Sequence, residues 1–226
     1  MIRHIVMAAG LLAASPASAA DLGAADPASL PFSWTGFYVG AHAGYAWGQG
    51  DAHYVNPLLA AIPLNTKPAG FYGGVQTGYN FQTGRVVLGG EADLSLGDVN
   101  DKIPDILGAL NDPPGPYTIT AKSDYSGTVR ARLGYSFDRF LPYLTGGYAW
   151  SHTEVSSTDG PVSDDAILSG WVLGLGAEYA FDEHWSAKAE YLHADFGDHT
   201  WFSGTAFASK SSSQTDTIRL GFNYRF

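Results

Sequence analysis

The sequence predicts an all-β protein: an eight-stranded antiparallel transmembrane β-barrel. Three observations support this fold class. Eight segments alternate between apolar and small or polar residues, the connections between them are alternately short and long, and aromatic residues gather at both ends of the segments. Composition agrees, because aromatics make up 14% of the chain and charged residues only 15%, against about 25% charged in an ordinary soluble domain.

The N-terminus has the features of a signal peptide. An apolar run over 5–14 follows a positively charged start, and small residues follow the run, as signal peptidase requires. The run is too short to span a bilayer, which takes about 20 residues. We expect residues 1–20 to be a signal peptide cleaved near Ala19 or Ala20, residues 21–33 to be a periplasmic linker, and residues 34–226 to form the barrel.

Each expected strand shows a period of two. In the first strand, Phe37, Val39 and Tyr45 share one face, while Gly40 and Gly44 share the other. The expected strands span 37–47, 71–81, 88–96, 125–137, 144–150, 171–181, 185–191 and 218–226. In chain order, their apolar faces include Phe37 and Tyr45; Val75 and Phe81; Leu88 and Leu94; Val129 and Leu133; Leu144 and Tyr148; Leu173 and Phe181; Trp185 and Tyr191; Leu220 and Phe226. Such segments are typical of strands that face lipid on one side and a barrel interior on the other.

The position of the charges favours a membrane barrel over a soluble one. Within the strands, residues such as Glu91 and Arg130 fall on the polar parity, and the apolar parity carries no charge. A soluble barrel would place its charges outside, since an apolar exterior in water leads to aggregation. In a bilayer that exterior is required.

Connection lengths predict the orientation. The short turns lie at 82–85, 138–139 and 182–184, and we expect them in the periplasm together with both chain ends. The expected extracellular loops span 48–68, 99–122, 152–166 and 197–213. Aromatic residues at both ends of the strands predict two interfacial girdles.

Eight charged residues are expected in the barrel interior, four acidic and four basic: Glu91, Asp93, Glu178 and Glu190, with Arg130, Arg132, Lys188 and Arg219. Counting from the periplasmic strand ends places Glu91 level with Arg132 and Asp93 level with Arg130. The short turn at 182–184 places Glu178 opposite Lys188. Buried charges must be paired, so we interpret the set as a structural network that fills a narrow barrel, in preference to a proton or ion path.

Histidines in the loops raise a hemin hypothesis. His53, Tyr54 and His199 are candidate axial ligands, since haem iron takes His or Tyr, and Trp201 could stack on a porphyrin. No close metal-ligand spacing occurs, so we expect no metal site and no resident cofactor. We expect no catalytic residues and no enzyme activity.

Charge and cysteine content exclude other classes. The net charge is −10 and the pI about 4.9, which argues against nucleic acid as a partner. Cys is absent, so disulfides are excluded. The expected loops are acidic, which fits a solvated surface, divalent-cation bridging to lipopolysaccharide, or adhesion to a host surface.

Several motifs resemble one family. These are Trp34-Thr35-Gly36-Phe37-Tyr38-Val39-Gly40, Gly170-Trp171-Val172-Leu173-Gly174, Glu178-Tyr179-Ala180-Phe181, Lys188-Ala189-Glu190-Tyr191-Leu192 and the terminal Leu220-Gly221-Phe222-Asn223-Tyr224-Arg225-Phe226. They are similar to the small alphaproteobacterial outer-membrane β-barrel surface antigens, often labelled the porin family. The resemblance implies an abundant, antigenic, OmpA-type barrel in the outer membrane of a Gram-negative cell, with some members that bind hemin or act as adhesins. It also implies that the barrel-assembly machinery reads Phe226.

We therefore expect a structural and surface protein that contributes to envelope integrity and presents acidic extracellular loops. Its expected partners are outer-membrane lipid, lipopolysaccharide and the barrel-assembly machinery. The alternatives are a hemin-binding barrel, a small-solute porin and a host adhesin.

Overall fold

The computed structural model describes residues 32–56, 63–104, 118–157, 163–204 and 208–226. The expected signal peptide and residues 21–31 of the linker lie outside the described residues. The strands are β1 Gly36–Tyr54, β2 Pro63–Thr66, β3 Ala69–Thr83, β4 Val86–Pro104, β5 Thr118–Tyr135, β6 Phe140–Ser157, β7 Ser163–Ala180, β8 Trp185–Trp201 and β9 Ser209–Arg225. Within this described part, no helix has the length and apolar character needed to cross a membrane.

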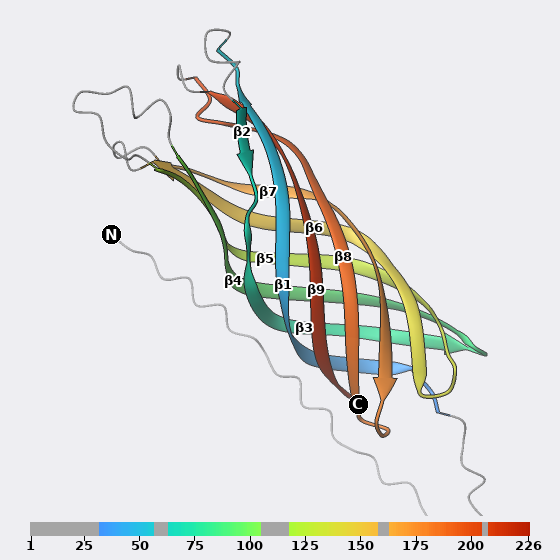
Figure 1. Ribbon diagram of the computed structural model, residues 1–226. Helices are drawn as coiled ribbons and strands as arrows, with labels where there is room; N and C mark the ends of the chain where they lie inside the picture. The colour runs from blue at the N-terminus through green and yellow to red at the C-terminus, as the bar shows by residue number, and fades with distance from the viewer. Residues whose placement is uncertain (1–31, 57–62, 105–117, 158–162, 205–207) are drawn as a thin grey trace, which may run out of the picture. The chain divides into compact units, whose positions relative to one another are not determined.

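The strands close into a barrel (Figure 1). Neighbours in the sheet are antiparallel, and β1 pairs with β9 from Tyr38 opposite Arg225 to Tyr54 opposite Ser209. Both β2 and β3 pair with β1, so they occupy one position in the wall, interrupted at Pro68, which has no N–H to donate. The predicted eight-stranded antiparallel barrel is confirmed.

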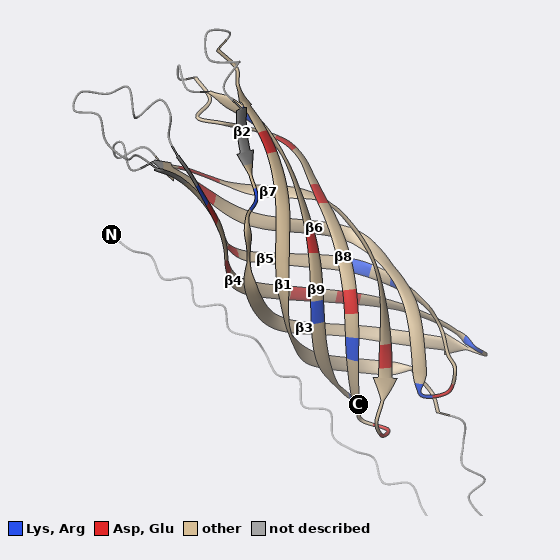
Figure 2. Ribbon diagram, viewed as in Figure 1, with Lys and Arg blue, Asp and Glu red and all other residues tan. Residues whose placement is uncertain are grey.

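The two faces of the wall differ as the alternation predicts. On the outer face, large apolar side chains are exposed, for example Phe71 at 78% and Leu220 at 66%. On the inner face, polar and charged side chains are buried. Figure 2 shows charged residues in the middle of β8 and β9, inside the span of the wall.

The strands are longer than the sequence predicts. For example, β1 continues to Tyr54, β4 to Pro104 and β8 to Trp201. Where the structure describes them, the expected loops 48–68, 99–122, 152–166 and 197–213 are therefore largely strand, which corrects the prediction. Beyond the apolar band of a membrane barrel both faces of the wall meet water. Polar residues then occupy both parities, and the alternation that marks a strand disappears.

The short turns lie where the sequence predicts them. Gly84 between β3 and β4 has φ +60° and Asp138 between β5 and β6 has φ +58°, a region that Gly and Asp enter more readily than most residues. These turns form the end of the barrel at which Phe226 also lies.

Candidate functional site: the charged lumen

The eight charged side chains expected in the interior are buried in the barrel. They come from β4, β5, β7, β8 and β9, and none is more than 4% exposed. Four are carboxylates and four are cations, so their formal charges cancel. Removal of charges from water is costly unless they are paired and hydrogen-bonded, so the contacts among them decide whether this interior is stable.

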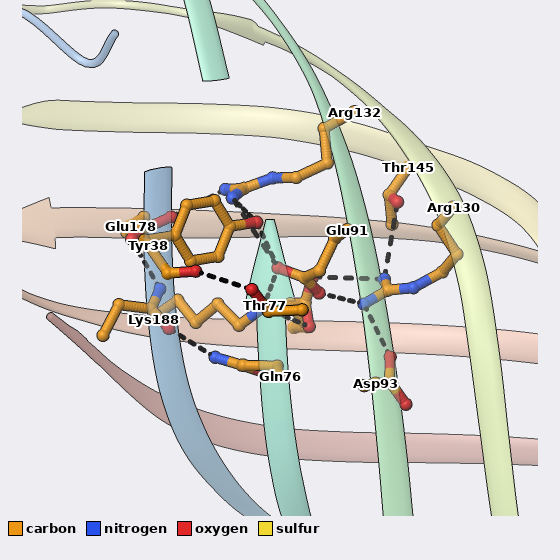
Figure 3. Close-up of polar contacts among 12 residues, drawn as sticks. Tyr38, Gln76, Thr77, Glu91, Asp93, Arg130, Arg132, Thr145, Glu178 and Lys188 are labelled. Atoms are coloured by element: carbon orange, nitrogen blue, oxygen red, sulfur yellow. Dashed lines mark hydrogen bonds and ion pairs between the residues drawn. The ribbon is translucent and has the colours of Figure 1, made fainter. Parts of the chain in front are cut away.

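Glu91 is the centre of the network (Figure 3). Its carboxylate contacts Arg130, and lies 2.6 Å from Lys188 Nζ, 3.2 Å from Arg219 and 3.7 Å from Arg132. One carboxylate therefore contacts four of the five buried cations; the fifth is Arg225.

Glu190 and Asp93 complete the neutralisation of these cations. Glu190 lies 2.6 Å from Arg219, 3.3 Å from Lys188 and 3.3 Å from Arg130. Asp93 lies 3.3 Å from Arg130 and 3.3 Å from Arg219. Because each of these three cations meets more than one carboxylate, the charges form a connected network rather than separate pairs.

Glu178 forms a second branch toward the end of the barrel that carries the short turns. It accepts hydrogen bonds from Arg132 at 2.7 Å, Ser186 at 2.6 Å and Asn223 at 2.8 Å. The Arg132 guanidinium also lies 3.9 Å from the centre of the Tyr143 ring, a cation–π geometry. These neighbours provide hydrogen-bond donors to the Glu178 carboxylate and an aromatic face to the Arg132 guanidinium.

The strand register corrects two of the expected pairings. Glu91 is directly opposite Arg130, and Arg132 is opposite Gly89. The expectation that Glu91 is level with Arg132, and Asp93 with Arg130, is wrong in register. Strand ends are staggered around a barrel, so a count from each strand end does not give the partner. Across the tight turn, Glu178 is opposite Lys188 as predicted.

Tyr38, on the same face of β1 as Gly40 and Gly44, is a further member of the network. Its hydroxyl donates to Glu91 at 2.7 Å and accepts from Arg132 at 3.0 Å. A Cβ at Gly78 would collide with that hydroxyl, so the glycine makes room for the ring. An inward aromatic residue facing a strand rich in glycine was the available sequence signal.

An apolar cluster lies at the end of the lumen near the short turns. Its buried members are Trp34, Val87, Leu141, Tyr143 and Ala180. The Trp34 side chain is fully buried, and its indole N–H donates to the Asp138 carbonyl at 2.9 Å. This cluster lies between the charged network and the end of the barrel that carries the short turns.

The segment before Trp34 belongs to the barrel unit. Phe32 packs against the cluster, and the Arg225 guanidinium lies 4.7 Å from its ring centre. Arg225 also donates to the Ser33 carbonyl. The compact unit starts at Phe32, two residues before the expected boundary.

The hemin candidates lie on the ends of β1 and β8 that are farthest from the short turns. His53 and Tyr54 are adjacent on β1, so their side chains point to opposite faces: His53 is exposed and Tyr54 is buried. The His199 ring lies 4.7 Å from the Trp201 ring. Hemin binding by these residues stays a prediction. Across the described ranges, no group of three or more potential ligands is arranged for a metal ion.

Phe226 lies on the outer wall at the end of the last strand. Its side chain is 72% exposed, its ring lies 5.7 Å from that of Phe37, and its N–H donates to the Phe37 carbonyl at 3.0 Å. A terminal aromatic residue in this position is accessible from outside the barrel. Its role in assembly stays a prediction.

An apolar outer wall and a charged, filled lumen define the class: this is an outer-membrane β-barrel protein. Comparisons with known proteins give the family. The family described as "Outer membrane protein beta-barrel domain" matches residues 5–226, and the chain belongs to it. The protein is therefore located in the outer membrane.

Two relatives agree with this family assignment. The chain is 34% identical to the 31 kDa outer-membrane immunogenic protein of Brucella melitensis, over 94% of this chain and 95% of the relative. It is 28% identical to the 22 kDa outer membrane protein of Rhizobium leguminosarum, over 86% and 79%. These relatives are described as outer-membrane or immunogenic proteins rather than as enzymes.

The outer membrane protease OmpT of Escherichia coli has a similar structure, with a TM-score of 0.52 over 89% of this chain and all of that one. At 9% sequence identity, this likeness shows the fold alone.

Proposed function

We propose that the protein is a structural barrel that contributes to envelope integrity and presents an acidic extracellular extension at the cell surface. The observation that carries the proposal is the filled lumen. Eight mutually neutralising charges occupy its middle, and the Trp34 cluster lies between them and the periplasmic mouth. A barrel of eight strands has an interior that side chains can fill, so this geometry favours a structural role over passage of solutes.

The test is the permeability of the cell envelope. Deletion of the gene should raise uptake of a hydrophobic dye such as N-phenylnaphthylamine, and expression of the wild-type chain should reverse the increase. Lys67→Ala, a change in an exposed side chain, serves as the matched control and should restore the barrier fully. Unchanged dye uptake after deletion would contradict the proposal.

Lipopolysaccharide is the proposed partner of the extracellular extension. Asp98, Asp101, Asp124, Glu154 and Asp165 lie on the outward ends of the strands, and divalent cations could bridge them to lipid phosphates. Calcium should then raise the melting temperature of the refolded barrel in lipopolysaccharide-containing vesicles more than in phospholipid vesicles. An equal rise of the melting temperature in both kinds of vesicle would mean that calcium binds without lipopolysaccharide, which would contradict this proposal.

Hemin binding, adhesion to a host surface and small-solute transport are the alternative functions. The hemin hypothesis is tested by titration of the detergent-folded protein with hemin. A Soret shift that is lost on replacement of His53 and His199 would support it, and the absence of a shift would favour the structural role.

A further inference from the structure

Beyond the membrane span, the barrel wall is open between β7 and β8. β7 pairs with β8 only up to Trp171 opposite Asp195, although β7 begins at Ser163 and β8 ends at Trp201. Over 163–170, β7 pairs with β6 on one side and has no ladder partner among the described strands on the other. In Figure 1 the outer ends of β4–β7 diverge from those of β1, β8 and β9.

A β-bulge explains where the seam begins. The register between β8 and β9 shifts between Asp195 and Asp198. Gly197, within the bulge, has φ +65°, and its N–H donates to the Asp195 side chain at 2.8 Å. Bulges bend the strand that carries them, so the outer end of β8 turns out of the ladder with β7.

A side chain, rather than a ladder bond, holds the outer end of β8 beside β7. The Phe202 N–H donates to Asp164 Oδ2 at 2.7 Å. Phe202 has φ +52°, which is unusual for an aromatic residue and signals local strain.

The exposed β7 edge carries one acidic and one apolar side chain on its outer face. On its outer face Asp165 and Ile167 are exposed, with Ile167 at 62%. Residues two apart on a strand share a face. A strand added to this edge would therefore match them with a basic residue and an apolar residue, also two apart.

We propose that the β7 edge over 163–170 docks an extended segment of a partner protein, with basic and apolar residues alternating on one face, as an added β-strand. Addition of a strand to a free edge gives affinity through main-chain hydrogen bonds and specificity through alternate side chains. The acidic character of the edge disfavours a second copy of this chain as the occupant, because Asp165 would then meet further acidic residues. Charged residues on a strand edge also prevent pairing with unsuitable chains, so Asp165 excludes strands that lack a basic residue at the matching position.

The probe is a labelled peptide, acetyl-Thr-Lys-Thr-Val-Thr-Lys-Thr-amide, which presents the same pattern in either strand direction. Its binding to the refolded barrel in detergent is measured by fluorescence anisotropy. Two N-methylated forms are compared, one methylated at the threonines and one at the lysines and valine. An added strand uses only one of these two sets of N–H groups, and both forms keep the charge.

The proposal expects that one methylated form loses binding and the other retains it. Asp165→Lys should weaken binding of the unmodified peptide several-fold, while Asp51→Lys on the outer face of β1 should not. Equal binding of both methylated forms would show charge adsorption alone and overturn the proposal. No binding of the unmodified peptide, or loss with both methylated forms, would also overturn it.

Discussion

At the scale of single residues, Glu91 has the most consequential position in the molecule. Its carboxylate meets four cations and the Tyr38 hydroxyl, whereas Glu178 meets one cation within ion-pair distance. Loss of one partner from a buried ion network leaves charges uncompensated, which costs more than the net value of the intact pair. The penalty should therefore scale with the number of cations that a carboxylate neutralises.

Glu91→Gln should lower the free energy of unfolding by about 3 kcal/mol or more, and Glu178→Gln should lower it by less. The measurement is urea unfolding of the refolded barrel in lipid vesicles, followed by tryptophan fluorescence. Arg130→Ala should resemble Glu91→Gln, since Arg130 contacts three carboxylates. Equal and negligible effects in all three variants would mean that the lumen is hydrated and its charges are unpaired.

His152 forms a second, separate cluster beyond Trp150 at the outer girdle. A bulge between Ser123 and Ser126 on β5 faces it. His152 Nδ1 lies 2.8 Å from Asp124, and Nε2 lies 3.6 Å from Asp165 on β7. The hydrogen bond with Asp124 raises the pKa of His152 above its ordinary value. Only the protonated ring can donate to both carboxylates.

This geometry predicts a pH dependence of stability. A pKa that is higher in the folded state gives stabilisation that is fully present below the unfolded value of about 6.5. That stabilisation is lost as the pH rises through the folded pKa. Melting temperatures between about pH 6 and pH 9 should fall more for the wild type than for His152→Gln. Parallel curves for the two proteins would contradict the account.

At the scale of elements, the segment before β1 closes one end of the barrel. Trp34 is fully buried among side chains of β4, β6 and β7, and its backbone N–H donates to Gln82 at 2.7 Å. Removal of a large buried side chain loses its transfer energy and leaves a cavity. The segment should therefore stabilise the barrel as much as a core residue does.

Trp34→Ala should lower the free energy of unfolding by about 3–5 kcal/mol. Trp185→Ala is the matched control, because Trp185 is 48% exposed on the outer wall and should contribute less. Both values come from urea unfolding in vesicles, read by far-ultraviolet circular dichroism. If the two variants lose equal stability, Trp34 does not act as a plug.

The sequence predicts the elements better than their lengths and register. Alternation identifies every membrane strand, because lipid and lumen impose opposite demands on the two faces. It does not show that β4 continues to Pro104 or β8 to Trp201, where both faces are polar. The partner of Glu91 also could not be counted from strand ends, since stagger and bulges belong to the closed barrel as a whole.

The candidate site shows the same limit: the sequence predicts which residues enter the lumen, but not which of them meet. The eight charges of the network are visible in the sequence as polar-parity residues between apolar neighbours. The central position of Glu91 is not visible, because it depends on Lys188 and Arg219, which reach it from the non-neighbouring strands β8 and β9, in addition to the two arginines of the adjacent β5. The hemin candidates show the opposite case: His53 and Tyr54 are neighbours in sequence, and strand geometry places them on opposite faces.

At the scale of the whole molecule, the barrel has three zones along its axis. The Trp34 cluster lies at the periplasmic end, the neutral charge network fills the middle, and Ala149, Val172 and Leu192 form a second buried apolar cluster. The outer wall meets lipid with exposed apolar side chains. This arrangement suits a protein whose role is to be a stable part of the membrane and to carry its extracellular strands.

Planar-bilayer recording of the refolded monomer tests the filled lumen most directly. The account predicts a silent membrane or small, rare openings, because paired side chains occupy the space that an open porin leaves to water. Glu91→Gln, if it folds, should make such openings more frequent. Steady nanosiemens-scale conductance from the wild-type protein would contradict the filled-lumen account and favour the small-solute porin.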